Sequence, residues 1–301
     1  MTMTTTTTIR LMLRLALLLF LPSSVHAQDP LQVLVIFAHP DEGEIYLGGT
    51  TALYTQLGHK VKFLSLTNGD AGHYSMKPKA LAQRRYREAM SAKAILALSD
   101  YEVLDHHDGV LRNTEQIQQT VASRIRDWRA DVVFTFYPAK GGHNDNMTAG
   151  WIVRDASLLL ELEADEMPAF VYVRDFHTTS FSYIPDVAIA IDDAWETKLA
   201  ACGAHESQVV EFNPQLEGVL DEVLASKERQ REFLVHNTYP FSKITPDNRL
   251  ALAKWYGSSR AAGVTYVEAF EIAEYGRQLR ESEIREVFPM LPSSAISGST
   301  E

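Results

Sequence analysis

Short apolar, β-prone runs alternate along the chain with longer segments in which apolar residues recur at helical spacing. Residues 31–38 (Leu-Gln-Val-Leu-Val-Ile-Phe-Ala) are almost wholly apolar, the pattern of a strand buried on both faces of a parallel sheet. Strands are predicted at residues 31–38, 60–67, 101–105, 130–137, 169–174 and 186–191. Helices are predicted at residues 44–57, 79–98, 114–128, 147–162 and 193–206. This alternation indicates βαβ units, and hence an α/β fold with a mainly parallel sheet flanked by helices.

The pattern changes after Pro214. Helices are predicted at residues 215–236, 247–261 and 280–287, with no clear strand between them. We therefore expect an α/β domain over residues 28–213 and a helical C-terminal extension over residues 214–291. Residues 292–301, rich in serine and other small residues, are expected to form a flexible tail.

The first 27 residues have the features of a secretory signal peptide. Arg10 and Arg14 precede an apolar run, Leu15 to Leu21, and Val25-His-Ala27 is a small-x-small cleavage pattern. The run is shorter than the roughly 20 residues that span a bilayer. An uncleaved anchor is the alternative. We expect cleavage near Ala27, a secreted or periplasmic protein, and no membrane span in the mature chain.

The charge balance and the cysteine content narrow the chemistry. Acids outnumber bases by 39 to 28, so the formal net charge is −11, and loss of two leader arginines makes the mature chain −13. An acidic chain is a poor candidate for nucleic-acid binding, which needs a basic face. Cys202 is the single cysteine, so neither an internal disulfide nor a cysteine-based metal cage is possible. A metal ion would need His, carboxylate or amide ligands.

The strongest chemical signal follows the first predicted strand. In Ala38-His-Pro-Asp-Glu-Gly-Glu44, an imidazole and three carboxylates share one strand-to-helix loop. Like charges this close repel unless a cation neutralises them, and mixed nitrogen and oxygen ligands suit zinc. The alternative is that the acids only favour the N-terminus of the following helix.

Three further polar segments follow predicted strands. They are residues 67–73 (Thr-Asn-Gly-Asp-Ala-Gly-His), 105–109 (Asp-His-His-Asp-Gly) and 141–146 (Gly-Gly-His-Asn-Asp-Asn). Each alone is compatible with a turn that carries an incidental histidine. Parallel strands, however, end at one edge of the sheet, where open α/β folds keep their sites. The convergence of four such segments predicts a site at that edge.

Several of these segments together resemble a known family. They are Ala38-His-Pro-Asp-Glu with Gly48-Gly-Thr50, Leu66-Thr-Asn-Gly-Asp-Ala-Gly72, Arg85-x-x-Glu88, His143-x-Asp145, and Ala204-His-Glu-Ser-Gln208. In this combination the chain resembles the PIG-L/LmbE-like zinc-dependent de-N-acetylases over residues 31–210. The resemblance implies a Rossmann-like fold and hydrolysis of an N-acetyl group on an amino sugar or glycoconjugate.

The resemblance also implies a zinc site. His39, Glu42 and Asn146 occupy the positions of the three ligands. The family has an aspartate where Glu42 stands and a histidine where Asn146 stands. An amide oxygen is a poor zinc ligand, so a second hypothesis remains open, in which the chain binds glycans without hydrolysing them. A serine hydrolase is poorly supported, because no G-x-S-x-G elbow follows a strand.

Catalytic and substrate-binding roles follow from the same resemblance. Asp41 corresponds to the general base, His143 to the residue that stabilises the oxyanion, and Asp145 to the aspartate that supports the site. Substrate contacts are expected from three further side chains, those of Arg85, His73 and His205.

Overall fold

The computed structural model describes residues 29–138, 142–175 and 184–293. The predicted signal peptide and most of the predicted tail lie outside these residues. Within the described residues, seven strands form one sheet in the order β3-β2-β1-β4-β5-β7-β6. The strands are β1 (Gln32–Phe37), β2 (Lys60–Thr67), β3 (Asp100–His106), β4 (Val132–Phe136), β5 (Ala169–Val173), β6 (Val187–Ala190) and β7 (Val267–Gly276).

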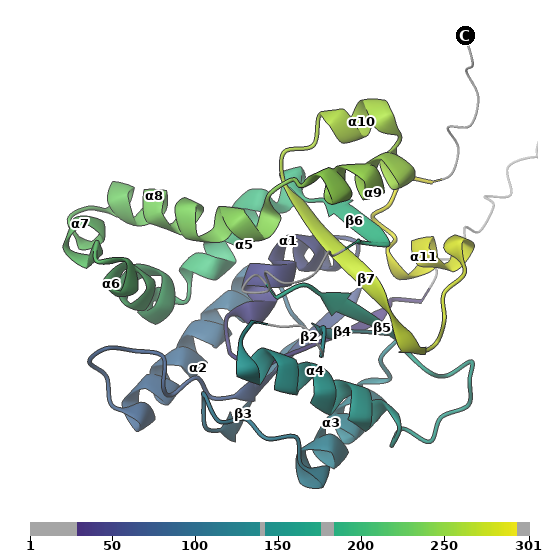
Figure 1. Cartoon of the computed structure of the whole chain (residues 1–301), viewed down its shortest axis with the longest axis horizontal. Coiled ribbons are helices and arrows are strands. Elements are labelled where there is room, and N and C mark those ends of the chain that lie inside the picture. Colours follow the sequence, from purple (N-terminus) through teal and green to yellow (C-terminus); the bar gives the residue numbers. More distant parts are fainter. Residues whose placement is uncertain (1–28, 139–141, 176–183, 294–301) are drawn as a thin grey trace, which may run out of the picture.

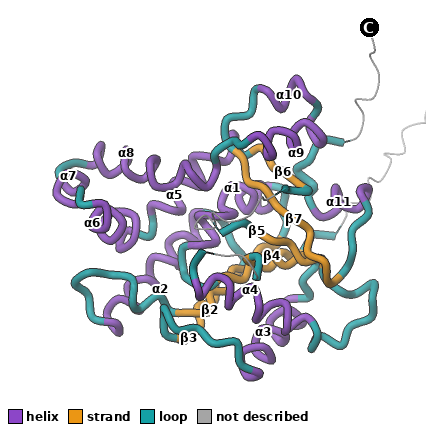
Figure 2. The backbone as a smooth tube through the Cα atoms, in the orientation of Figure 1, coloured by secondary structure: helices purple, strands orange, loops and turns teal. Residues whose placement is uncertain are grey.

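The first five strands run parallel and confirm the predicted α/β fold. Helices cover both faces of the sheet (Figures 1 and 2). Those that connect the parallel strands are α1 (Glu42–Gln56), α2 (Pro78–Ile95), α3 (Glu115–Trp128) and α4 (Asn144–Ser157), and α5 (Trp195–Gly203) follows β6. Right-handed βαβ crossovers of this kind leave the carboxyl ends of the strands at one edge.

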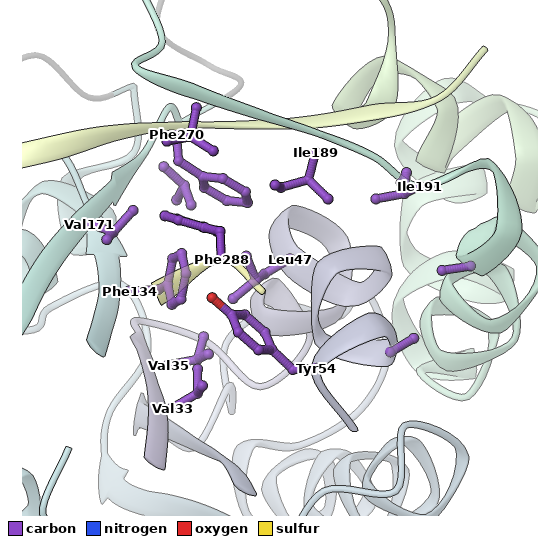
Figure 3. Packing of buried hydrophobic residues seen from close by; sticks show 14 of the residues in the cluster. Val33, Val35, Leu47, Tyr54, Phe134, Val171, Ile189, Ile191, Phe270 and Phe288 are labelled. Atoms are coloured by element: carbon purple, nitrogen blue, oxygen red, sulfur yellow. The ribbon is translucent and has the colours of Figure 1, made fainter. Parts of the chain in front are cut away.

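The sheet is buried on both faces, which explains the continuous apolar runs in the sequence. Along β1, Val33 and Val35 face a core that includes residues of α1 and α5, whereas Leu34 and Ile36 face a second core under α3 and α4. Successive side chains of a strand point to opposite faces, so each residue needs an apolar side chain when both faces are covered. Figure 3 shows the first core, where Phe134, Phe270 and Phe288 pack beside Leu47 and Tyr54.

The expectation of a wholly helical C-terminal segment is wrong. Residues Val267–Gly276 form β7, which lies between β5 and β6 and runs antiparallel to both. The sequence does not predict this strand because it contains glutamates at positions 268, 271 and 274, whereas buried strands are expected to be apolar. The C-terminal segment therefore completes the sheet and is not an appendage to it.

Most of the remaining C-terminal residues are helical. The elements are η2 (Ser207–Phe212), α6 (Asn213–Glu217), α7 (Leu220–Leu224), α8 (Lys227–Thr238), η3 (Tyr239–Ser242), α9 (Pro246–Tyr256), α10 (Ser258–Ala262) and α11 (Glu281–Val287). We call residues 207–242 the helical wall, and Figure 1 shows its helices α6 to α8 together on one side of the molecule. In the part of the chain that the structure describes, no helix combines the length and the apolar character needed to cross a bilayer.

Helix α1 makes a close approach at its paired glycines. A Cβ atom on Gly49 would lie 2.7 Å from Cδ1 of Ile191, closer than real Cβ contacts allow. We expect Gly49→Ala to destabilise the fold by about 1–3 kcal/mol, because overpacking outweighs the gain in helix propensity. Urea unfolding measures this change. Gly263→Ala is the matched control, since the new Cβ would meet only Arg260 O, at 3.7 Å; equal effects of the two variants would contradict the prediction.

Candidate active site

Polar side chains from three strand ends meet at the carboxyl edge of the sheet. His39 follows β1, Asp108 follows β3, and Asp145 lies in the first turn of α4, after β4. One ligand-type atom of each lies within 4.8 Å of the others. His39 Nε2 is 2.9 Å from Asp108 Oδ1 and 3.6 Å from Asp145 Oδ2. This is a possible metal site of one imidazole and two carboxylates.

The backbone fixes the orientation of this group. Glu42 accepts a hydrogen bond from the His39 backbone N–H at 2.8 Å, and its other oxygen lies 3.1 Å from His39 Nδ1. The ring is thereby held so that Nε2 faces the two aspartates. Asp145 in turn accepts hydrogen bonds from the backbone N–H groups of Gly109 and Leu111, at 2.7 and 3.2 Å. Glu42, which was predicted as a metal ligand, here orients the imidazole.

The cluster requires a positive charge. Burial alone would lower the pKa of His39, but the carboxylates of Glu42, Asp108 and Asp145 outweigh burial and hold that pKa well above its usual value. Burial opposes ionisation of Asp108, yet His39 and Arg85 bring its pKa down to about 2. Either a proton on the His39 imidazole or a divalent cation would neutralise the carboxylates around it, and binding of a cation would displace the proton.

Asp41 lies beside the cluster in a buried ion pair. Its Oδ1 is 3.0 Å from Nη2 of Arg85, which also donates to the carbonyl of Pro40 at 3.1 Å. Burial raises the pKa of Asp41, and the guanidinium of Arg85 opposes this shift. Gly69 adopts φ 66°, and a Cβ there would lie 2.4 Å from the guanidinium. The glycine of the Thr-Asn-Gly-Asp segment is therefore required to admit Arg85.

The turn before α4 contributes two more predicted residues. His143 caps the helix, because its Nδ1 accepts from the backbone N–H of Asp145 at 3.3 Å, and its ring centroid lies 5.0 Å from that of His39. Asp175, which follows β5, accepts hydrogen bonds from the His143 backbone N–H and from Asn146 Nδ2, at 3.0 and 3.2 Å. Asn146 Oδ1 is buried and has no hydrogen-bond partner among the described residues.

The cluster opens into a cavity of about 750 Å³. One side is formed by the segments that follow the strands, including His39, Asp41, Asp108, His143 and Asn146, together with Arg85 of α2. The opposite side is formed by the helical wall, including Phe212, Asn213, Asn237 and Phe241. Elements far apart in the sequence thus enclose one space.

Two predicted substrate contacts lie elsewhere. His73 is not among the residues that line the cavity; its Nε2 lies 3.0 Å from Glu211 Oε2, and its ring stacks on Tyr74. His205 is fully buried, with Nε2 3.2 Å from Glu44 Oε1, and is likewise absent from the lining. Of the three predicted substrate-binding side chains, Arg85 is the one that the cavity reaches.

Two acidic residues at the site were missed. Asp108 is in the segment Asp-His-His-Asp-Gly, which was predicted to lie at the carboxyl edge of the sheet without a role for any of its residues. Within this segment, the side chain of His107 is 54% exposed and pairs with Asp70, and Asp108 is the residue that reaches His39. Asp175 follows β5 directly, and its position at a fifth strand end was the available signal.

The helical wall is attached to the sheet domain through two of the segments that carry the family resemblance. They are Arg85-x-x-Glu88 and the Ser207-Gln208 part of Ala204-His-Glu-Ser-Gln208. Glu88 accepts hydrogen bonds from Ser207, from the backbone N–H at 2.9 Å and from Oγ at 2.6 Å. Gln208 Nε2 donates to the carbonyl of Gly72 at 2.9 Å. Next to them, Arg84 pairs with Glu211 at 2.9 Å. These contacts hold the wall opposite the catalytic edge.

A mainly parallel α/β sheet that carries a His–Asp–Asp group and a buried carboxylate at the edge of a cavity is the arrangement of a metal-dependent hydrolase. Residues 34–157 match the PIG-L family, described as GlcNAc-PI de-N-acetylase. The chain therefore belongs to the PIG-L family and is a hydrolase of the de-N-acetylase class.

Individual relatives agree with this assignment. The chain is 30% identical over 192 residues to the diacetylchitobiose deacetylase of Thermococcus kodakarensis, which covers 61% of this chain and 72% of the relative. It is 29% identical over 185 residues to a probable N-acetyl-alpha-D-glucosaminyl L-malate deacetylase 2 of Bacillus cereus, over 58% and 83% of the two chains. The fold is shared with the N,N'-diacetylchitobiose deacetylase of Pyrococcus horikoshii, with a TM-score of 0.57 and 22% identity over 80% of this chain and 83% of that one.

Proposed function

We propose that the protein uses zinc to hydrolyse the N-acetyl group of an N-acetylated amino sugar or glycoconjugate. The observation that carries the proposal is the His39–Asp108–Asp145 group beside Asp41 in one cavity. The names of the two relatives supply the substrate class, since both are deacetylases of N-acetylated sugars. From its leader, we propose that the activity is secreted or periplasmic.

The residues at the site fit a divalent cation. One imidazole nitrogen and two carboxylates offer ligand atoms within 4.8 Å, and mixed nitrogen and oxygen ligands are those that zinc takes in catalytic sites. Glu42 and Asn146 add two neighbouring donors, of which Asn146 Oδ1 is buried with no partner in the described part of the chain. We propose that His39 and its neighbouring carboxylates hold the ion and that Asn146 Oδ1 faces it.

The reaction assigns a task to each side chain. When bound, the cation supplies Lewis-acid chemistry that polarises the amide carbonyl and acidifies the attacking water. Asp41 accepts a proton from the attacking water while the water oxygen bonds to the carbonyl carbon. Asp41 later delivers a proton to the leaving amine as the C–N bond breaks. His143 stabilises the oxyanion, and Arg85 holds the Asp41 carboxylate in place. The products are acetate and the free amino sugar.

The purified protein allows a direct test. We expect bound zinc by elemental analysis, acetate release from at least one N-acetylated sugar, and loss of that release on chelation with recovery when zinc is returned. Unchanged acetate release after complete metal removal would overturn the proposal. The alternative of glycan binding without hydrolysis is not favoured, because the relatives reported above are named as deacetylases.

Asn146 gives a sharper prediction about the metal. An imidazole binds zinc better than an amide oxygen does, so Asn146→His is expected to tighten zinc binding by about tenfold or more. Competition with a chromogenic chelator measures the dissociation constant. Asn144→His, at an exposed position of the same turn, is the matched control and is expected to leave the constant unchanged. Equal constants for the two variants would place Asn146 away from the ion.

A further inference from the structure

The two ends of the Asn146 amide have different surroundings. The side chain is buried, and its Nδ2 donates to Asp175 Oδ2 at 3.2 Å. Its Oδ1 is also buried but has no hydrogen-bond partner in the described part of the chain. A buried acceptor without a partner is costly, and binding of a cation removes that cost. The orientation of this amide therefore decides whether an oxygen is offered to the metal cluster.

Asp175 permits only one orientation of that amide. A carboxylate accepts hydrogen bonds and does not donate them, so the end of the Asn146 amide that faces it has to be the N–H₂ group. The reversed amide would bring Oδ1 against the carboxylate oxygen and would break the bond from Nδ2. The position of Asp175 therefore fixes Oδ1 on the opposite side of the amide.

The order of the strands places the metal cluster on that opposite side. Asn146 is in the first turn of α4, which follows β4, and β4 lies between β1 and β5 in the sheet. Asp175 follows β5, whereas His39 follows β1. With Nδ2 directed to the β5 side, Oδ1 is directed to the β1 side, where His39 lines the same cavity as Asn146. The unpartnered oxygen is thereby turned toward the cluster.

The carboxylate of Asp175 is itself held on both of its oxygens. Its Oδ2 accepts hydrogen bonds from the backbone N–H groups of Gly142 and His143, at 3.2 and 3.0 Å. Its Oδ1 accepts from the hydroxyl of Tyr46, on α1, at 3.1 Å. Carboxylates that bond to the far side of a metal ligand fix the orientation of that ligand and make it a stronger donor. A buried carboxylate held by two separate elements is suited to this task.

We infer that Asp175 is a positioning residue of the metal site, which holds the Asn146 amide with Oδ1 toward the ion. An asparagine can then serve at the position where the family has a histidine. Through the backbone of Gly142 and His143, the same carboxylate also fixes the turn that carries His143. The inference rests on the proposed function for the presence of the ion, but the orientation of the amide is measurable without metal and without catalysis.

Zinc affinity, measured by competition with a chromogenic chelator, tests the role of Asp175. Asp175→Asn is expected to weaken zinc binding by about 10–100-fold, the usual cost of removing the partner of a metal ligand. In an Asn146→Ala background, the same substitution is expected to change the dissociation constant by less than about twofold, because no amide is left to orient. A role in folding alone would weaken zinc binding by the same factor in both backgrounds. Asp192→Asn is the matched control, since Asp192 also accepts from a backbone N–H, that of Thr265 at 2.9 Å, but does not line the cavity.

NMR of the metal-free protein separates this inference from the proposed function. The N–H₂ signals of Asn146, identified by their absence from Asn146→Ala, are expected to exchange with water about tenfold more slowly in the natural chain than in Asp175→Asn. This result, with a loss of zinc affinity that depends on Asn146 but no acetate release from any sugar, would support the inference and overturn the hydrolase. Equal exchange rates, or an equal loss of zinc affinity in both backgrounds, would overturn the inference and leave the hydrolase intact. A natural chain that binds no zinc would overturn both.

Discussion

Replacing Asp41 by asparagine is expected to lower kcat for acetate release by about 10²–10⁴-fold, the usual contribution of a general acid–base residue. Asparagine has nearly the same shape but cannot accept the proton of the attacking water. Arg85 keeps its hydrogen bonds to the carbonyls of Pro40 and Gly69, so we expect the pocket to retain its form. Steady-state acetate release measures the loss.

The metal content of the variants distinguishes a base from a ligand. Asp41→Asn is expected to retain zinc, whereas His39→Ala is expected to lose it, because His39 lies at the centre of the cluster. Asp105→Asn is the matched control, an exposed aspartate at the end of β3 whose side chain accepts from Asn68, and it is expected to leave kcat unchanged. Activity of Asp41→Asn close to that of the natural chain would remove Asp41 from the mechanism.

The parallel strands of the fold were predictable because the feature that identifies each of them, an apolar run, lies within the strand itself. Strands covered on both faces need apolar residues at every position, so they appear as uninterrupted runs, of which β1 is the clearest. Strand β7 was missed for the opposite reason. Glu268 can be buried there because Lys198, 70 residues away, neutralises it and backbone N–H groups of α1 bond to it, and no local pattern in the sequence predicts such partners.

The site was predictable in part. His39, Asp41 and Asp145 stand in recognisable segments directly after strands, and parallel topology brings them to one edge. Asp108 was overlooked because the direction of each side chain after β3 depends on where that strand ends. The segment Ala204-His-Glu-Ser-Gln208 has a structural role in this chain, since His205 is buried against Glu44 and Ser207 bonds to Glu88 and so attaches the helical wall to α2.

The largest effect on stability is expected from Lys198→Met. Lys198 Nζ lies 2.6 Å from Glu268 Oε1, and both side chains are fully buried. Methionine fills most of the space but leaves the Glu268 carboxylate without its cation. Removing one partner of a buried pair costs about 3–5 kcal/mol. Urea unfolding measures the loss; Arg231→Met, which breaks an exposed pair with Glu196, is the control and is expected to cost under about 1 kcal/mol.

The second partner tests whether the charge or the hydrogen bonds matter more. Glu268 also accepts hydrogen bonds from the backbone N–H groups of Gly49 and Thr50, at 3.0 and 2.7 Å, and so links β7 and α5 to the middle of α1. Adding Glu268→Gln to Lys198→Met removes the uncompensated charge and keeps an acceptor for α1. The double variant is therefore expected to be more stable than Lys198→Met alone. If the double variant is less stable than Lys198→Met, the hydrogen bonds from Gly49 and Thr50 to the carboxylate contribute more to stability than the uncompensated charge costs. The carboxylate of Glu268 is then needed chiefly to hold α1, the helix that begins beside Asp41.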